Sequence, residues 1–150
     1  MPHIMIVVSP YYDEVAEHLL TGAKAALDEA HATYEVFDVA GAFEIPTAIK
    51  MGSLREEKRS TDHREFDGFL ALGCVIRGET AHYDIVSNES ARGLTQLSLD
   101  YNLLIGNAIL TCDTHEQAVI RANPAEKNKG ADAVAAVLSL LNLKRALYSK

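Results

Sequence analysis

A histidine lies where an apolar segment of the chain gives way to a segment with helical periodicity. The apolar residues 69–76 end in the turn 77–80, after which apolar residues recur at helical spacing from Ile85 to Leu97, so His82 falls in the first turn of a helix. Backbone N–H groups at the start of a helix lack partners and carry the positive end of the helix dipole, so they attract anions. An imidazole can donate and accept protons near neutral pH. We therefore predict that this junction holds an anion beside a group that transfers protons.

The ends of the other apolar segments carry further residues that could bind a ligand. Tyr11 and Tyr12 follow the first apolar segment, residues 41–44 follow the second, and residues 107–113 belong to the end of the fourth. The carboxyl ends of parallel strands meet at one edge of a sheet, and ligands bind at that edge. These residues are therefore expected to converge with His82 on a single site.

Three charged side chains are weaker candidates for a binding role. Glu89 lies on an otherwise apolar helix stripe, where it either pairs with Arg92 or contacts another subunit. Arg121 and Lys129 flank the loop 123–130 and could bind phosphate, although basic side chains in loops are more often simply solvated. Residue type and spacing leave both alternatives open.

These residues must be positioned by an alternation of strands and helices. The uninterrupted apolar segment 3–9 is typical of a strand that is buried on both faces of a parallel sheet. The polar segment 55–66 is expected to form a solvated helix end and loop rather than a buried element, and its mixed charges carry no specific signal. A capping box opens a short helix at either 113–116 or 114–117. We predict an α/β fold with a four-stranded, mainly parallel sheet, with strands at 3–9, 34–39, 69–76 and 103–111 and helices at 13–27, 44–54, 80–101, 115–121 and 131–147.

Length and composition indicate one domain, spanning 1–150, that binds neither nucleic acid nor membranes. Fourteen Lys and Arg against 21 Asp and Glu give a net charge of −7, which disfavours nucleic acid and anionic lipid as partners. The chain starts with a strand-like segment rather than a signal peptide, so we expect a cytoplasmic protein. Cys74 and Cys112 lie in apolar segments and are expected to be buried hydrophobic side chains rather than nucleophiles. The apolar fraction of 48% favours self-association.

Five short motifs, spread over nearly the whole chain, occur here in a specific order. They are Gly41-Ala-Phe-Glu-Ile-Pro46, Leu72-Gly-Cys-Val-Ile-Arg-Gly-Glu-Thr-Ala-His-Tyr-Asp84, Asn88-Glu-Ser-Ala-Arg-Gly93, Leu110-Thr-Cys-Asp-Thr-His-Glu-Gln-Ala118 and Asn128-Lys-Gly130. Any one of them is a weak signal, but all five in this order are highly specific. Through them the chain resembles the lumazine synthase family.

The resemblance implies a fold, a reaction and an assembly. The fold would be a flavodoxin-like three-layer sandwich, and the subunits would form pentamers whose active sites lie between neighbours. The reaction would be a transferase step of riboflavin biosynthesis, in which 5-amino-6-ribitylaminouracil condenses with 3,4-dihydroxy-2-butanone 4-phosphate and phosphate and water are lost, without a metal or organic cofactor. Two alternatives are a non-catalytic shell protein that binds flavin or lumazine, and a pentameric riboflavin synthase, for which the phosphate-binding residues would have no substrate phosphate.

The resemblance also implies roles for individual residues. His82 matches the proton-transfer histidine, and Tyr11 matches the aromatic residue that stacks on the pyrimidine. The sequence departs from the family pattern at Pro10-Tyr11-Tyr12, in place of Arg-Phe-Asn, and at Asn107, where many members place an aromatic residue from the adjacent subunit. These changes bear on pyrimidine affinity more than on the chemistry. The expected pyrimidine- and ribityl-binding residues are Tyr11, Gly41, Ala42, Phe43, Glu44, Cys74, Val75, Ile76 and Asn107, and the expected phosphate-binding residues are Gly78, Glu79, Thr80, Arg121 and Lys129.

Overall fold

A four-stranded sheet organises the computed structural model, which describes residues 1–56 and 64–149. The strands are β1 (His3–Val8), β2 (Thr33–Asp38), β3 (Gly68–Ile76) and β4 (Ile105–Cys112). All strand pairs are parallel and the spatial order is β2-β1-β3-β4. In the register, Val7 pairs with Phe37 and Ala71, and Ala71 pairs in turn with Asn107. The predicted α/β fold with a parallel sheet is therefore confirmed.

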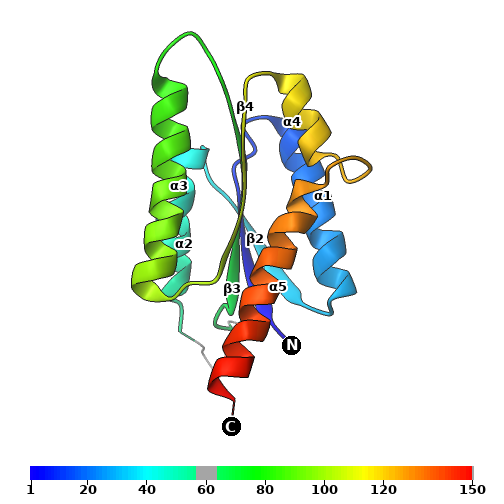
Figure 1. Cartoon of the computed structure of the whole chain (residues 1–150), viewed down its shortest axis with the longest axis vertical. Helices are drawn as coiled ribbons and strands as arrows, with labels where there is room; N and C mark the ends of the chain where they lie inside the picture. The colour runs from blue at the N-terminus through cyan, green and yellow to red at the C-terminus, as the bar shows by residue number, and fades with distance from the viewer. Residues whose placement is uncertain (57–63, 150) are drawn as a thin grey trace.

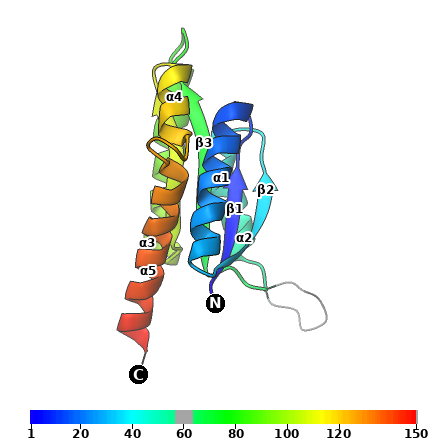
Figure 2. The same ribbon diagram turned by 90° about the vertical axis from the view of Figure 1, so that its right-hand side faces the viewer.

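Helices cover both faces of the sheet and complete three layers, as Figure 1 and Figure 2 show. One face carries α1 (Asp13–Glu29), α4 (His115–Ala122) and α5 (Lys129–Tyr148), and the other carries α2 (Ile45–Ser53) and α3 (His82–Tyr101), with the short 3₁₀ helix η1 (Ala42–Glu44) before α2. The strand order and the layers are flavodoxin-like, as the sequence implied. Within the described ranges, no helix is long and apolar enough to cross a membrane.

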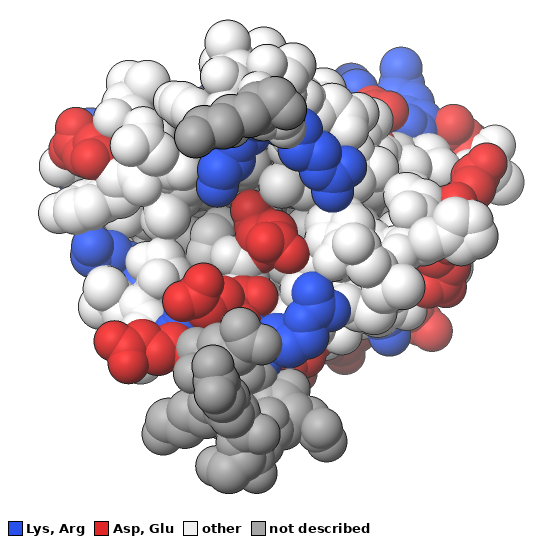
Figure 3. Space-filling model, turned by 90° about the horizontal axis from the view of Figure 1, so that it is seen from below, with Lys and Arg blue, Asp and Glu red and all other residues white. Residues whose placement is uncertain are grey.

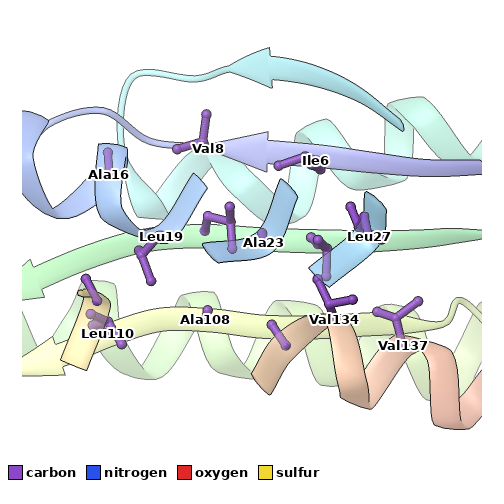
Figure 4. Packing of buried hydrophobic residues seen from close by; sticks show 14 of the residues in the cluster. Ile6, Val8, Ala16, Leu19, Ala23, Leu27, Ala108, Leu110, Val134 and Val137 are labelled. Atoms are coloured by element: carbon purple, nitrogen blue, oxygen red, sulfur yellow. The ribbon is translucent and has the colours of Figure 1, made fainter. Parts of the chain in front are cut away.

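The alternation of side chains along the strands divides the hydrophobic core into two layers. Even-numbered residues of the inner strands, such as Ile6 and Leu72, pack with α1 and α5, while odd-numbered residues, such as Val7 and Ala71, pack with α2 and α3. Figure 4 shows the first of these layers, with side chains of α1, α5 and the strands in contact. Because both faces of β1 and β3 are buried, these strands are continuous apolar segments in the sequence, which made them easy to predict.

The start of α4 decides between the two predicted capping boxes. The Thr114 hydroxyl accepts a hydrogen bond from the Gln117 N–H at 3.2 Å, and Gln117 Oε1 accepts one from the Thr114 N–H at 3.3 Å. The box therefore spans residues 114–117. It fixes the direction in which the chain leaves β4, at the same edge of the sheet as the turn before α3.

The start of α5 corrects the sequence prediction. A loop was expected through Gly130, but α5 already begins at Lys129, after Asn128 in a left-handed conformation with φ of 47°. The reason is a close approach of two helices, because a Cβ at Gly130 would collide with the carbonyl oxygen of Leu19 in α1. Glycine therefore lets the first turn of α5 pack directly on α1.

The polar segment 55–66 makes specific contacts at both of its described ends. Arg55 donates a hydrogen bond to a carboxylate oxygen of Glu35 over 2.9 Å, and Phe66 stacks on the ring of His3 with 5.2 Å between the centroids. The described ends of the segment, residues 55–56 and 64–66, form the expected loop, but these contacts were not predicted, and residues 57–63 lie outside the described residues. The missed signal was Phe66, an aromatic residue that needs an apolar surface to cover it.

Glu35, on β2, links the stability of the fold to pH. Burial raises the pKa of this carboxyl group, but hydrogen bonds from His3, at 2.8 Å, and from Arg55 outweigh burial and hold the pKa below its usual value of 4.5. Because the folded-state pKa lies below the unfolded-state pKa, the ionised group stabilises the fold above the unfolded-state pKa. This stabilisation is lost as the pH falls through the folded-state pKa.

We expect Glu35→Gln to make the free energy of unfolding less sensitive to low pH. The free energy of unfolding of the wild type should fall steeply as the pH drops below about 4.5, and that of Glu35→Gln should fall less, because the substituted amide does not titrate. Urea denaturation at a series of pH values measures both. Glu17→Gln, which changes an exposed carboxyl group on α1, is the matched control and should behave as the wild type. Identical pH profiles for Glu35→Gln and the wild type would contradict the prediction.

Charges of both signs occupy the end of the molecule that carries the amino ends of the strands. Figure 3 shows Lys and Arg side chains interspersed with Asp and Glu on this face. The hydrogen-bonded pair of Arg55 and Glu35 belongs to this end of the sheet. Opposite charges therefore lie close enough here to offset one another's potential.

Candidate active site

A pocket of about 450 Å³ opens at the carboxyl ends of the strands. It lies where β1 and β3 are neighbours but their following helices, α1 and α3, cover opposite faces of the sheet, which leaves a crevice between them. Eleven of the residues predicted for the site line this pocket: Tyr11, Gly41, Ala42, Phe43, Glu44, Cys74, Val75, Ile76, Gly78, Thr80 and His82.

The turn between β3 and α3 brings His82 and backbone amides to this pocket. His82 is the first residue of α3, its side chain is exposed, and its N–H donates a hydrogen bond to the Thr80 hydroxyl at 3.3 Å. The preceding residue, Ala81, offers no side-chain cap, so the next amides of the helix are available to an anionic ligand. A Cβ at Gly78 would meet nothing within 4 Å, so there is room for a ligand beside the turn.

Arg77 fastens this turn to the end of the neighbouring strand. Its Nε donates a hydrogen bond to Asp113 Oδ1 at 2.9 Å, and its guanidinium group lies 4.3 Å from the ring centroid of Tyr83 in α3. A longer contact of 3.7 Å joins it to Asp84. These contacts hold the first turn of α3, and with it His82, against the start of the connection from β4 to α4.

Aromatic rings border the pocket on the side of β1 and β2. Tyr11 is 74% exposed and Phe43 is 53% exposed, so each presents an apolar surface to a ligand. Tyr11 meets the ring of Tyr12 edge-on, with 5.0 Å between the centroids and an interplanar angle of 77°. The faces of the Tyr11 ring can therefore take up a planar heterocycle by stacking.

Glu44 places a carboxylate over the turn that contains η1. Its side chain is exposed and folds back toward Gly41, where a Cβ would lie 3.2 Å from Glu44 Oε2. Together with the backbone of Gly41 and Ala42, this carboxylate offers hydrogen-bond acceptors and donors to a ligand that carries several hydroxyl groups.

The thiol in the pocket is not suited to nucleophilic chemistry. Burial, together with the neighbouring Cys112, raises the pKa of the Cys74 thiol to about 12. Burial also raises the pKa of Cys112. Both cysteines are buried and free, so the prediction that they are hydrophobic side chains of the core is confirmed. Across the described part of the chain, no group of three or more His, Cys, Asp or Glu side chains is placed to hold a metal ion.

Two predicted residues of the turn and the edge strand lie outside the pocket of a single chain. Glu79 is exposed in the turn before α3 and does not line the pocket. Asn107 is exposed on β4, and its Oδ1 accepts a hydrogen bond from the Ile109 N–H at 2.8 Å. Their roles in binding substrate stay predictions.

Two predicted basic residues also lie outside this pocket. Arg121 is half-buried near the end of α4 and donates a hydrogen bond to the Gln117 carbonyl oxygen at 3.1 Å. Lys129 is exposed at the start of α5 and pairs with Asp132 at 3.2 Å. The expected convergence of all the strand ends is therefore incomplete within one chain, and the phosphate-binding roles of Arg121 and Lys129 stay predictions.

Glu89 is accounted for within its own helix. Its Oε2 lies 2.6 Å from Arg92 Nη2, and the hydrogen bond from Arg92 holds the pKa of Glu89 below its usual value. Of the two alternatives that the sequence left open, the structure contains the pair within α3. The carboxylate of Glu89 is therefore not part of the pocket.

Four residues line the pocket without having been predicted at this edge: Ser9, Ala40, Tyr83 and Val86. Tyr12, which also lines the pocket, was expected here beside Tyr11 but was given no role. Ser9 and Ala40 come just after β1 and β2, so the rule that placed Tyr11 in the site could have identified them too. Tyr83 and Val86 are three residues apart on α3 and share a face of that helix. Helical periodicity placed Val86 in the core and gave no sign that the same face borders a pocket.

Comparison with known proteins decides the family of the chain. Residues 2–145 match the model of the 6,7-dimethyl-8-ribityllumazine synthase family. The chain is 51% identical over 146 residues to 6,7-dimethyl-8-ribityllumazine synthase of Agrobacterium fabrum, an alignment that covers 97% of each chain. This chain belongs to the 6,7-dimethyl-8-ribityllumazine synthase family.

Other lumazine synthases are similar over the same length. The chain is 49% identical over 145 residues to 6,7-dimethyl-8-ribityllumazine synthase 1 of Rhizobium meliloti. This alignment covers 97% of this chain and 93% of that protein. It is 47% identical over 147 residues to the lumazine synthase of Zymomonas mobilis. This alignment covers 98% of this chain and 99% of that protein. The resemblance to lumazine synthases that rested on five sequence motifs is therefore confirmed.

Proposed function

We propose that this chain catalyses the condensation of 5-amino-6-ribitylaminouracil with 3,4-dihydroxy-2-butanone 4-phosphate to 6,7-dimethyl-8-ribityllumazine, the penultimate step of riboflavin biosynthesis. The observation that carries the proposal is that, in a member of the lumazine synthase family, Tyr11, the start of α3 and His82 border the same pocket. A stacking surface, an anion-binding helix start and a proton-transfer group are what this reaction requires.

The pyrimidine substrate is proposed to bind on the β1 and β2 side of the pocket. Its ring would stack on Tyr11, and its ribityl chain would lie along residues 41–44, where the Glu44 carboxylate and backbone groups meet hydroxyl groups. Both contacts exist before the reaction begins. They would therefore serve to orient the substrate rather than to stabilise a particular transition state.

His82 is the proton carrier in this proposal. The 5-amino group of the pyrimidine attacks the ketone carbon, and the resulting hydroxyl group leaves as water to form an imine. Phosphate is then eliminated, and the enol that remains becomes a ketone. The ribitylamino nitrogen attacks this second carbonyl carbon to close the ring, and a second water is lost. Each of these steps moves a proton, which an imidazole can accept in one step and return in another. Cys74 lines the same pocket, but its raised pKa keeps it protonated, so the thiol does not compete for this role.

The phosphate group is proposed to bind at the turn before α3. The backbone of residues 78–80 and the first amides of the helix supply donors, and the helix dipole adds a favourable potential. Arg121 and Lys129 would supply the compensating positive charge. Because these two residues and Asn107 lie outside the pocket of their own chain, we propose that they complete the pocket of a neighbouring copy.

Pockets that are completed by a neighbouring copy require an assembly, which we propose to be a pentamer or a larger particle built of pentamers. Exposed apolar side chains, such as Met51 at 70% and Leu99 at 76%, leave surface that a neighbouring chain could cover. We expect light scattering to give a mass of at least five times the 16.4 kDa of one chain. A monomer at the concentration used in the activity assay would contradict the shared site.

The test of the function is to mix the purified protein with both substrates and follow the fluorescence of the lumazine. Product should form faster than in the uncatalysed mixture, with phosphate released in equal amount. A protein that binds lumazine or riboflavin without turnover would instead be a binding shell protein. Conversion of lumazine to riboflavin, without use of the butanone phosphate, would identify a riboflavin synthase.

Tyr11→Ala is expected to weaken binding of the pyrimidine substrate. Stacking on an aromatic ring contributes about 1–3 kcal/mol per base, so the KM for the pyrimidine should rise roughly 5- to 150-fold, with a smaller effect on the KM for the butanone phosphate. Steady-state kinetics with each substrate varied in turn measures this. Tyr148→Ala, at an equally exposed tyrosine outside the pocket, is the control. An unchanged KM for the pyrimidine would show that the substrate ring does not stack on Tyr11.

A further inference from the structure

Two adjacent tyrosines at the end of β1 have opposite environments. Tyr11 is 74% exposed at the pocket, whereas Tyr12 is half-buried and packs against the core layer between the sheet, α1 and α5. The rings meet edge-on at 5.0 Å between centroids, the arrangement that favours contact between the positive edge of one ring and the negative face of another. The described aromatic contact of Tyr11 is this one alone. The orientation of the exposed ring therefore depends on the ring of Tyr12.

The hydroxyl group of Tyr12 lies beside the end of β3. Residues along a strand direct their backbone groups alternately to the two neighbouring strands, and the Arg77 N–H donates to the Cys112 carbonyl oxygen of β4 at 2.9 Å. The Ile76 N–H therefore points to the other side, where β1 has already ended at Val8. The Ile76 backbone lies close enough to the Tyr12 hydroxyl group to lower its pKa, so the Tyr12 side chain lies beside the end of β3.

The charge state of Tyr12 agrees with this placement. Burial raises the pKa of its hydroxyl group, Cys74 and Tyr11 raise it further, and the hydrogen bond with the Ile76 backbone acts in the opposite direction. The side chain is thus a neutral phenol at neutral pH. A neutral hydroxyl group in this position is an anchor and not an acid or base for the reaction.

A third contact holds the far side of the Tyr12 ring. His115, the first residue of α4, has its ring centroid 6.3 Å from that of Tyr12 at an angle of 56°. The imidazole is in turn fixed to α1, because His115 Nε2 lies 3.3 Å from Glu14 Oε2. Tyr12 therefore contacts β3 and α4 as well as the exposed ring of Tyr11.

We propose that Tyr12 is a positioning residue for the pyrimidine substrate, which holds the ring of Tyr11 in the orientation that stacks on the substrate. This proposal rests on the proposed function, because it concerns Tyr11, the residue on which the pyrimidine substrate of that reaction is proposed to stack. Tyr12 acts through Tyr11 and does not take part in proton transfer. It therefore determines the KM for the pyrimidine and leaves the chemical step unchanged.

The test combines kinetics with a double-mutant cycle. Tyr12→Leu keeps an apolar side chain but removes the ring edge and the hydroxyl group, and should raise the pyrimidine KM about tenfold. Tyr12→Phe removes only the hydroxyl group and should raise this KM about threefold. Both variants should change kcat and the KM for the butanone phosphate less than about twofold. In a Tyr11→Ala background, Tyr12→Leu should have almost no further effect on the pyrimidine KM, because the ring it supports is gone.

The control is Tyr34→Phe, which removes a hydroxyl group from another half-buried tyrosine, on β2, whose pKa is also raised by burial. It should match the wild type in both kinetic constants. A parallel rise in both KM values with a fall in kcat would show a general loss of structure and overturn the proposal. An equal effect of Tyr12→Leu with and without Tyr11 would show that Tyr12 binds the substrate directly, and would also overturn it.

A second measurement separates this proposal from the proposed function. Titration with 6,7-dimethyl-8-ribityllumazine, followed by its own fluorescence, gives the Kd of each variant whether or not the chain turns over substrate. If the wild type binds lumazine but is inactive, the proposed function fails. The double-mutant cycle of Tyr11 and Tyr12, measured as the Kd for lumazine, then still supports or overturns the role of Tyr12. If the wild type binds no lumazine, both proposals fall together.

Discussion

His82→Ala is expected to lower kcat about 10²- to 10⁴-fold, the range in which general acid and base catalysis contributes to enzymatic rates. The imidazole is exposed at the first turn of α3 and lines the pocket, where it can reach a bound substrate without a change in the fold. Any condensation that proceeds without the enzyme would hide part of this loss, so the uncatalysed rate is measured separately and subtracted.

The same substitution should leave folding and assembly unchanged. The hydrogen bond that links His82 to Thr80 uses the backbone N–H and survives the substitution, and an exposed side chain contributes little to the core. His31→Asn is the matched control, because His31 is exposed outside the pocket and has a φ of 57° that asparagine tolerates. Equal kcat values for His82→Ala and the wild type would remove His82 from the proposed mechanism.

Arg121→Ala is expected to raise the KM for the butanone phosphate by about tenfold or more and to change kcat much less. A hydrogen bond to a charged group contributes about 1.5–3 kcal/mol, and a phosphate contact already exists in the ground state. The guanidinium group is half-buried at the end of α4 and donates a hydrogen bond to a carbonyl oxygen of its own helix, which restricts its orientation. Inorganic phosphate should also become a weaker competitive inhibitor.

The control and a mixing experiment decide how Arg121 reaches the site. Arg145→Ala removes an exposed arginine from the last turn of α5 and should keep wild-type kinetics. If neighbouring chains share each site, assemblies that contain both His82→Ala and Arg121→Ala chains should hold some sites with neither substitution, and should therefore be more active than either variant alone. An unchanged KM in Arg121→Ala would refute its assignment to the phosphate group.

The inner part of the fold could be predicted because its physical signals are local. The strands β1 and β3 are buried on both faces and so form unbroken apolar segments. The buried faces of the helices appear in the sequence as apolar residues that recur at helical spacing. The start of α5 was misplaced because its position depends on the contact between Gly130 and Leu19, which are far apart in the sequence. The contacts of Arg55 and Phe66 with the first two strands were missed for the same reason.

The candidate site could be predicted where residues follow a strand directly, and not where they depend on contacts between elements. His82 and Tyr11 come straight after β3 and β1, so the topology alone places them at one edge. Tyr12 was seen at this edge but received no role, because its importance lies in contacts with α4 and the end of β3. The proposed role of Arg121 in the pocket of a neighbouring copy would depend on surfaces between chains, which the pattern of one sequence does not describe.

The hydrogen bond from Ile109 to Asn107 bears on how this chain avoids aggregation. β4 pairs on one side with β3, and in the described part of the chain its other side is an open edge to which odd-numbered residues direct their backbone groups. The Asn107 side chain occupies the Ile109 N–H on that edge, so a strand from another molecule would find one donor of the ladder already taken. A strand that paired with β4 from another molecule would therefore form one hydrogen bond fewer than it would at an open edge.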